Sequence, residues 1–238
     1  MNDGDFVKID FVGRVKDTDE IFDLTIEDVA KKEGIYNPKK GYGPALVIVG
    51  KEMVIPGVDE QLRQMKVGDE KEFEVPKEKA FGNRDLTKIK IVSYSKFIKE
   101  KIEPVPGLFV DIDGREAKIQ TVNGGRVRVD FNHPLAGKAL KYRLKVVEEI
   151  KDTKEKASEL VEKYGMNAVI KDTRIDETGK LTLVIEKDIP KSVKDVIKSQ
   201  IEKYVTEVKD IQFELRPQID RKNNNPEHAE NSTGTNKV

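Results

Sequence analysis

The chain has 238 residues, of which 44 are Lys or Arg and 44 are Asp or Glu, so its formal net charge is zero. A balanced charge argues against a general nucleic-acid binder, because such proteins are normally basic. Cysteine is absent and no apolar run approaches membrane-spanning length, which argues against a disulfide framework and a membrane protein. The mixed N-terminus indicates no signal peptide, and 37% charged residues without cysteine are typical of a cytoplasmic protein from a thermophile.

The first part of the chain predicts strands packed around one short helix. Residues 5–15 alternate apolar and polar side chains, as a half-buried strand does. Pro56 suits the first turn of a helix, and Val58, Leu62 and Met65 then form one apolar stripe along it. The other predicted elements are strands at 21–24, 47–49 and 70–75, a short helix at 25–32 and a glycine- and proline-rich loop at 34–44.

Residues 83–132 predict a small β module. Asp113-Gly114 and Asn123-Gly124-Gly125 are hairpin turns, and each lies beside runs that alternate apolar and polar residues. A module of about fifty residues is marginally stable by itself, so we expect support from the domain that its two ends re-enter. An alternating strand at 140–146 then closes the first domain.

The remaining segment predicts a small α+β domain in the order α-β-β-α-β, with both helices on one face of its sheet. A helix starts at Thr153 and ends at Gly165, and Ser192 is the predicted N-cap of a second helix. Strands are predicted at 168–176, 180–186 and 208–215. From residue 217 onward the sequence is polar and rich in Asn, and we expect disorder there.

Three separated stretches resemble the FKBP-type peptidyl-prolyl cis-trans isomerases. They are VGKEMVIPGVDEQLRQMKVGDEKEFEVPKEKAFG, which starts at Val49, FVGRVKDTDEIFD at 11–23 and NHPLAGKALKYRLKVVEEI at 132–150. The last stretch is similar to the SlyD-like branch and to long archaeal members, which carry a domain inserted in the flap. The resemblance implies an α+β fold, with an FKBP-like antiparallel half-barrel sheet wrapped on a short helix, an inserted small β-rich domain and a C-terminal αββαβ domain. The implied division is 1–84 with 134–151 for the isomerase domain, 85–133 for the insert, 153–216 for the C-terminal domain and 217–238 for the tail.

Ordinary catalytic constellations find no support in the sequence. There is no thiol nucleophile, and His133 and His228 lie far apart in the chain. Neither an HExxH motif nor a phosphate-binding glycine loop occurs, so we expect no metal and no cofactor. Prolyl isomerisation needs none of these groups, because its barrier is the partial double bond of the amide, about 18–20 kcal/mol. An apolar pocket with one or two hydrogen-bond donors can lower that barrier.

The resemblance assigns such a pocket residue by residue. Its members are Phe11, Phe22, Asp23, Val54, Ile55, Val58, Phe81 and Tyr142. The backbone N–H of Ile55 would donate to a substrate carbonyl, and Asp23 would be the one polar side chain. Pattern alone would make the apolar members ordinary core residues and Asp23 the cap of a turn.

Three positions depart from the family pattern. Val58 replaces a bulky floor residue, Phe81 replaces Tyr, and Ala45 stands where many relatives have Phe. A larger and less polar pocket is expected to bind the family's macrolide inhibitor poorly and to slow turnover. Tyr36 or Tyr42 in the long loop could compensate.

The resemblance also implies that the insert binds unfolded, proline-containing polypeptides and delivers them to the pocket. Its candidate client-binding residues are Val92, Tyr94, Phe97, Ile98, Val105, Leu108 and Phe109, some of which must instead fill the insert's own core. The C-terminal domain is a candidate for homodimerisation on the same ground. The rival reading is a holdase or interaction protein that keeps the fold without useful catalysis.

Overall fold

The computed structural model describes residues 1–216, which divide into two compact units. The first unit is Met1–Lys156 and the second begins at Ala157. The predicted disordered tail, 217–238, lies outside the described residues. Within the described part, no helix is long and apolar enough to cross a membrane.

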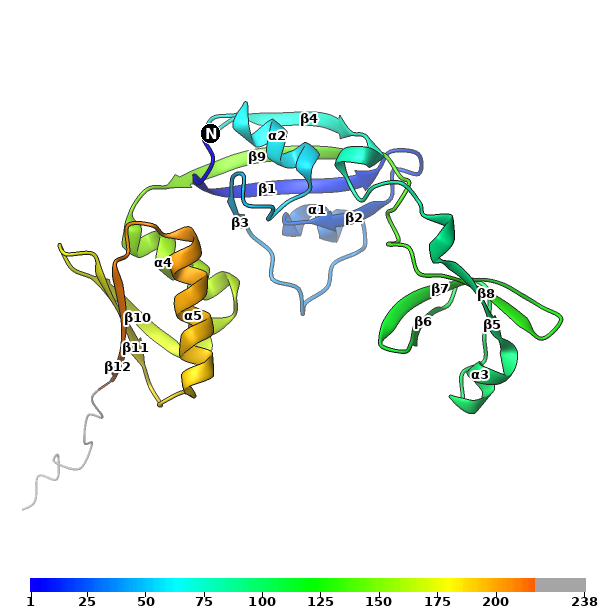
Figure 1. Cartoon of the computed structure of the whole chain (residues 1–238). Coiled ribbons are helices and arrows are strands. Elements are labelled where there is room, and N and C mark those ends of the chain that lie inside the picture. The colour runs from blue at the N-terminus through cyan, green and yellow to red at the C-terminus, as the bar shows by residue number, and fades with distance from the viewer. Residues whose placement is uncertain (217–238) are drawn as a thin grey trace, which may run out of the picture. The chain divides into compact units, whose positions relative to one another are not determined.

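The first unit is built on a five-stranded antiparallel sheet (Figure 1). Its order is β2-β1-β9-β4, and β3 shares an edge of β1 with β2. β3 pairs with Phe6–Ile9, and β2 pairs with Val12–Arg14. The alternation predicted for the closing strand is confirmed, since Leu144 is buried and Lys145 is exposed. The strands are β1 (Phe6–Val15), β2 (Ile21–Leu24), β3 (Ala45–Ile48), β4 (Glu70–Val75) and β9 (Leu140–Ile150).

Helix α2 (Pro56–Arg63) packs on this sheet and provides the centre of its core. The predicted stripe is confirmed, because Val58, Leu62 and Met65 are all buried. Pro56 occupies the first turn, as expected. Asp59 was not singled out from the sequence, although its carboxylate is buried and accepts a hydrogen bond from Gly50 N–H at 2.9 Å. This bond ties the helix to the turn that precedes it. A short 3-10 helix, η1 (Lys77–Lys79), follows β4.

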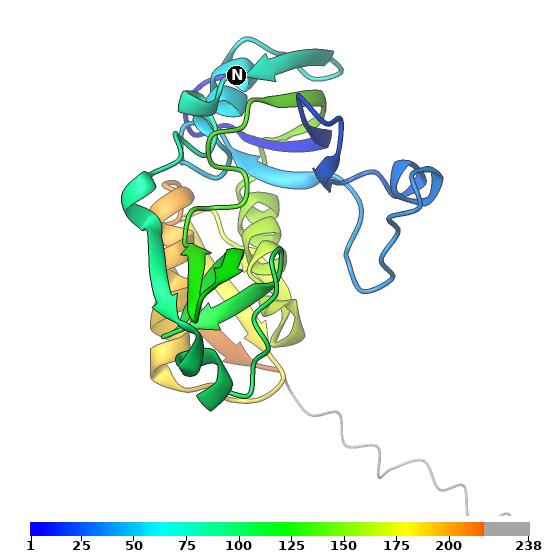
Figure 2. The same cartoon turned by 90° about the vertical axis from the view of Figure 1, so that its right-hand side faces the viewer.

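Helix α1 (Glu27–Lys32) is shorter than predicted, because Thr25 is used differently. The Thr25 hydroxyl is buried and bonds to β1, so the helix starts two residues later. The loop at 34–44 contains no strand, in agreement with its composition. Figures 1 and 2 show this loop extending away from the sheet. Residues of α1 and Tyr42 of the loop pack on a second small core made of Val12, Leu24 and Ala30.

The insert forms a four-stranded sheet in the order β5-β8-β7-β6. Both predicted hairpins are present, one between β6 and β7 and the other between β7 and β8. Helix α3 (Tyr94–Lys99) was not predicted, and it carries Phe97 into the core of the insert. The strands are β5 (Ile89–Ser93), β6 (Phe109–Ile112), β7 (Arg115–Asn123) and β8 (Arg126–Asp130), preceded by the 3-10 helix η2 (Leu86–Lys88).

The second unit has the predicted order of helices and strands, with α4 and α5 on one face of its sheet (Figures 1 and 2). Strand β10 is antiparallel to β11, whereas β12 is parallel to it because α5 forms the crossover. The prediction that Ser192 caps α5 is wrong: Pro190 holds that position and no side chain caps the helix. The elements are α4 (Thr153–Lys163), the 3-10 helix η3 (Met166–Ala168), β10 (Ile170–Ile175), β11 (Lys180–Ile185), α5 (Lys191–Tyr204) and β12 (Asp210–Leu215).

Candidate functional site

Tyr142 lies at the centre of an aromatic cluster on the main sheet. It occupies the central strand β9, opposite Gly13 of β1 and Phe73 of β4. Its ring centroid lies 5.9 Å from that of Phe11, 5.8 Å from that of Phe22 and 6.0 Å from that of Phe73. The Phe22 ring meets it edge-on, at an interplanar angle of 76°. These separations are typical of favourable aromatic pairs.

The Phe22 ring reaches Tyr142 by passing over Gly13, and any larger residue at that position would push the ring aside. A Cβ atom added at Gly13 would lie 2.6 Å from the ring tip of Phe22. The missing side chain on β1 therefore provides the space in which the Phe22 ring lies. The sequence contains Gly13, but nothing in its pattern shows which ring it accommodates.

Phe11 is positioned by a residue that sequence reasoning missed. The backbone N–H of Phe11 donates to the Thr25 hydroxyl at 2.9 Å, and this hydroxyl donates to Asp10 at 2.8 Å. Thr25 is 7% exposed, so its hydroxyl needs these partners. Such a bond between distant segments has no local sequence signal.

The start of α2 contributes the apolar floor and one backbone donor. Val58 is 2% exposed, while Val54 and Ile55 are partly buried against the same core cluster as Tyr142. The carbonyl of Ile55 accepts the first hydrogen bonds of the helix, from Val58 and Asp59. No partner for the N–H of Ile55 occurs among residues 1–216, so this donor is available to a ligand.

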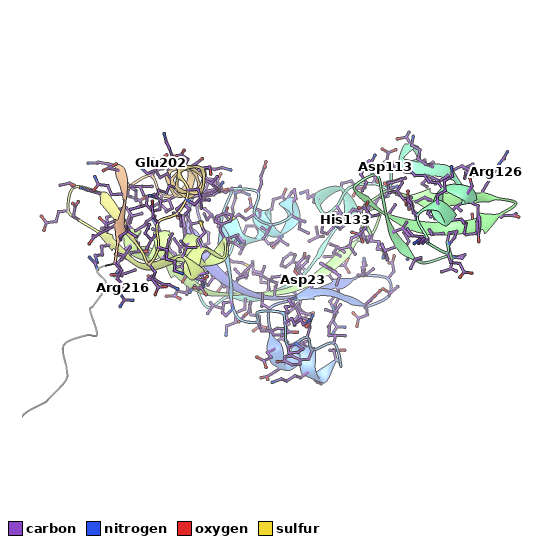
Figure 3. All side chains as sticks on the ribbon, turned by 90° about the horizontal axis from the view of Figure 1, so that it is seen from below. Asp23, Asp113, Arg126, His133, Glu202 and Arg216 are labelled. Atoms are coloured by element: carbon purple, nitrogen blue, oxygen red, sulfur yellow. The ribbon has the colours of Figure 1, made fainter. Side chains whose placement is uncertain are left out.

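Asp23, labelled in Figure 3, is exposed at the end of β2. One carboxylate oxygen accepts from the N–H of Leu24 at 2.9 Å and from the ammonium group of Lys40 at 2.7 Å. Asp23 therefore fits both roles considered from the sequence: it caps its own turn through Leu24, and it is the polar side chain close to the Tyr142 cluster. Lys40 was not identified from the sequence.

The environment of Tyr142 keeps its hydroxyl protonated. Burial, and secondarily the negative charge of Asp23, raises the pKa of Tyr142 far above its usual range. Desolvation has this effect because it penalises the charged phenolate. The site therefore presents a neutral phenol at any ordinary pH.

Phe81 packs at the edge of the cluster and is stacked on His133. The two rings are 4.2 Å apart and almost parallel, at 3°. His133 belongs to the segment between β8 and β9 and is labelled in Figure 3. The Phe81 ring is thus stacked on a residue at the C-terminal end of the insert.

The structure brings all seven apolar members of the predicted site into or against one core cluster. Phe73 is an addition, since the sequence predicted only the strand that carries it. The possible compensation by Tyr36 or Tyr42 stays a prediction: these rings stack on each other at 5.5 Å, and Tyr42 packs on the second core. Ala45 lies against the main cluster.

The candidate client-binding residues of the insert fall into two groups. Phe97 is 1% exposed and fills the insert's core, which removes it from the accessible surface. Val92 and Tyr94 are partly buried against that core. The remaining candidates are exposed apolar residues, namely Ile98, Val105, Leu108 and Phe109. Two other exposed apolar residues, Leu86 and Ile91, were not predicted from the sequence.

Comparisons with known proteins identify the family of the chain. Residues 1–98 match the model of the FKBP-type peptidyl-prolyl cis-trans isomerase family, and residues 90–135 match the FKBP26 IF domain. The chain is 40% identical over 143 residues to a short-type peptidyl-prolyl cis-trans isomerase of Methanocaldococcus jannaschii, which covers 60% of this chain and 90% of that protein. The chain belongs to the FKBP-type peptidyl-prolyl cis-trans isomerases. It is therefore an isomerase of X-Pro bonds, and its substrates are proline-containing polypeptides.

Two further relatives bear on the type of FKBP. An Escherichia coli FKBP-type 16 kDa peptidyl-prolyl cis-trans isomerase is 34% identical over 132 residues, 53% of this chain and 86% of that protein. The SlyD isomerase of Helicobacter pylori is 31% identical over 109 residues, 44% of this chain and 58% of that protein. The two relatives match 53% and 44% of this chain, and the IF-domain match lies at residues 90–135, within the first unit.

Proposed function

We propose that this FKBP isomerises prolyl bonds against the Tyr142 cluster and acts as a folding chaperone through its insert. The observation that carries the first part is the convergence of three aromatic rings on Tyr142, with Val58 below them and the N–H of Ile55, which has no partner within residues 1–216, beside them. Phe11, Phe22 and Tyr142 form the walls, Val54 and Phe81 line the edge, and Asp23 marks the polar rim.

The chemistry requires no acid or base. The planar imide has a large dipole that water solvates well, so removal from water destabilises the planar form more than the twisted one. A barrier of about 18–20 kcal/mol falls when the twisted form is bound better than either planar isomer. The N–H of Ile55 fixes the substrate through a carbonyl, and the aromatic walls exclude water from the imide.

The test is isomerisation of a proline tetrapeptide, measured beside the refolding of a protein whose folding is limited by proline. Phe22→Ala and Asp23→Ala are expected to lower both rates. Tyr36→Ala is the matched control, since its ring lies in the exposed loop. If neither site variant changes either rate, Phe22 and Asp23 do not belong to the site; only an unaltered protein that accelerates neither reaction would be a holdase with an FKBP fold.

The insert offers the surface for unfolded chains. Ile98 is 52% exposed, Val105 47% and Phe109 46%, in a module with a core of its own. Exposed apolar groups of this kind mark interaction surfaces. Ile98→Ser with Phe109→Ser is expected to weaken suppression of aggregation while tetrapeptide turnover persists. Equal suppression by the variant would contradict this role.

The C-terminal domain is proposed to mediate homodimerisation. Val193 and Val196 are exposed on α5, at 42% and 59%. Val193→Glu with Val196→Glu would place charge on this face, and light scattering should then report a lower mass than for the unaltered protein. An unchanged mass would count against this surface. Cytoplasmic residence and the lack of nucleic-acid or membrane binding stay predictions.

A further inference from the structure

Two adjoining cavities lie at the foot of the insert, where the chain returns to the isomerase sheet. Their volumes are about 380 and 280 Å³. Five residues line both of them: Phe109, Lys118, Asn132, His133 and Pro134. We call these cavities together the junction cleft.

The walls of the junction cleft are fixed by one buried carboxylate. Asp130 is 7% exposed and accepts hydrogen bonds from Arg84, from Gln120 at 3.0 Å and from Asn132 at 2.7 and 2.9 Å. Burial alone would raise the pKa of Asp130, but the hydrogen bonds from Asn132 and Arg84 hold it below its usual range. Asn132 also bonds to Asp85 in both directions, which ties the strand that leaves the sheet to the strand that returns.

The charge left in the larger cavity is positive. Arg84 and Asp130 neutralise each other, whereas Lys118 and Lys138 line the cavity and have no carboxylate partner within residues 1–216. The ammonium group of Lys118 lies 5.3 Å from the ring centroid of Phe109, so a cation and an apolar ring adjoin. Glu116 lines only the smaller cavity.

The junction cleft also has a physical link to the prolyl site. His133 lines both cavities, and its ring stacks at 4.2 Å on Phe81 at the edge of the Tyr142 cluster. A polypeptide held in the cleft is thereby held beside the residue that borders the isomerase site.

We propose that the junction cleft binds an extended segment of the client chain that carries a carboxylate next to an apolar side chain. Lys118 and Lys138 receive the carboxylate, and Phe109 receives the apolar group. This inference rests on the proposed function and adds a preference to it, for prolines flanked by acidic-aromatic segments. Occupation of the cleft raises the effective concentration of the nearby proline at Tyr142.

The experiment compares two peptides that share one proline and a flexible spacer. One peptide ends in Glu-Phe-Glu and the other in Lys-Phe-Lys, with spacers of about 2–8 residues that reach up to roughly 28 Å. The full chain is expected to show kcat/KM roughly tenfold higher for the acidic peptide, about 1.4 kcal/mol, since two lysines act on it together. The ratio should fall toward one at about 1 M salt, where the Debye length is about 3 Å.

Variants then locate the preference. Lys118→Glu and Lys138→Glu should each lower the acidic-to-basic ratio at least about threefold, and Lys118→Met should lower it less. Lys99→Glu makes the same charge change on the insert but away from the cleft, so it should leave the ratio unaltered. Because the readout is a ratio, a general loss of turnover cancels from it.

Four results would overturn the proposal. The first three are an acidic-to-basic ratio near one in the unaltered protein, an effect of Lys99→Glu as large as that of the cleft variants, and an unchanged ratio in the cleft variants. The fourth is displacement of the acidic peptide by a single-stranded oligonucleotide at a concentration below that of the peptide. The last would make the cleft a nucleic-acid site. A failure of the proposed function looks different, because the unaltered protein would then fail to isomerise the proline tetrapeptide at all.

Discussion

The space beneath Phe22 offers a sharp test of the proposed site through Gly13→Ala. The new Cβ atom would lie 2.6 Å from the ring tip, whereas carbon atoms pack at about 3.5–4.0 Å, so the ring must retreat by roughly 1 Å. Gly13 does not have a left-handed backbone, and alanine therefore adds no strain of its own there. The substitution moves one wall of the cluster and changes little else.

Two effects of different size are expected from this shift. Overpacking of this kind lowers the free energy of unfolding by about 1–3 kcal/mol. The cost stays in this range because Phe22 is only partly buried and its ring can move. A misplacement of about 1 Å near reacting groups can lower a rate by about 100-fold. We therefore expect kcat/KM for a proline tetrapeptide to fall between about 10- and 100-fold, with only a modest drop in Tm.

The matched control is Gly41→Ala, in the exposed loop, where an added Cβ would meet nothing within 4 Å. It should leave both turnover and Tm close to those of the unaltered protein. A second variant, Gly13→Ala with Phe22→Leu, relieves the clash and should recover stability without full activity. Turnover within about twofold of the unaltered protein in Gly13→Ala would show that Phe22 is not a wall of the site.

Three further predictions concern stability. The raised pKa of Tyr142 means that the folded protein keeps this phenol protonated at pH values where the unfolded chain ionises it. The free energy of unfolding should therefore be unaffected by Tyr142 below about pH 10 and should fall by about 1.4 kcal/mol per pH unit above it, up to the pKa of the folded state. Urea titrations of Tyr142→Phe should lack this loss. Asp130→Asn should cost about 1–3 kcal/mol and speed hydrogen exchange in β8, since buried donors lose their charged acceptor, and unaltered exchange would argue against that role. Val58→Trp should lower Tm, because Val58 is already 2% exposed in a packed cluster, and a higher Tm would reveal unfilled space.

Much of the fold could be predicted because its strands alternate cleanly. The pattern Leu-Lys-Tyr-Arg-Leu from Leu140 onward can bury one face only, so it fixes which side of β9 points to the core. The glycine turns of the insert likewise have few alternatives, since Gly114 and Gly124 adopt positive φ angles of 74° and 55°. Local rules decide such features.

Tertiary constraints decided what the sequence did not predict. Helix α3 was missed because its six residues are too few to show a helical period, and Phe97 is held by the core rather than by propensity. Thr25 belongs to the same class, since its hydroxyl bonds to a strand 14 residues away. Which apolar residues of the insert are exposed depends on packing that no single-residue pattern encodes.

The polar groups near Tyr142 also favour binding energy over proton transfer as the source of catalysis. Asp23 already has its carboxylate bonded to Lys40 and to the N–H of Leu24, and Tyr142 holds its proton firmly. Tyr142 is therefore not poised to give up its proton, whereas the N–H of Ile55 is a donor without a partner in the described chain. A reaction that only rotates one bond can use such a site, because it needs a dry apolar surface and a fixed donor. Phe81 offers no hydroxyl group to such a site, and its ring is stacked on that of His133.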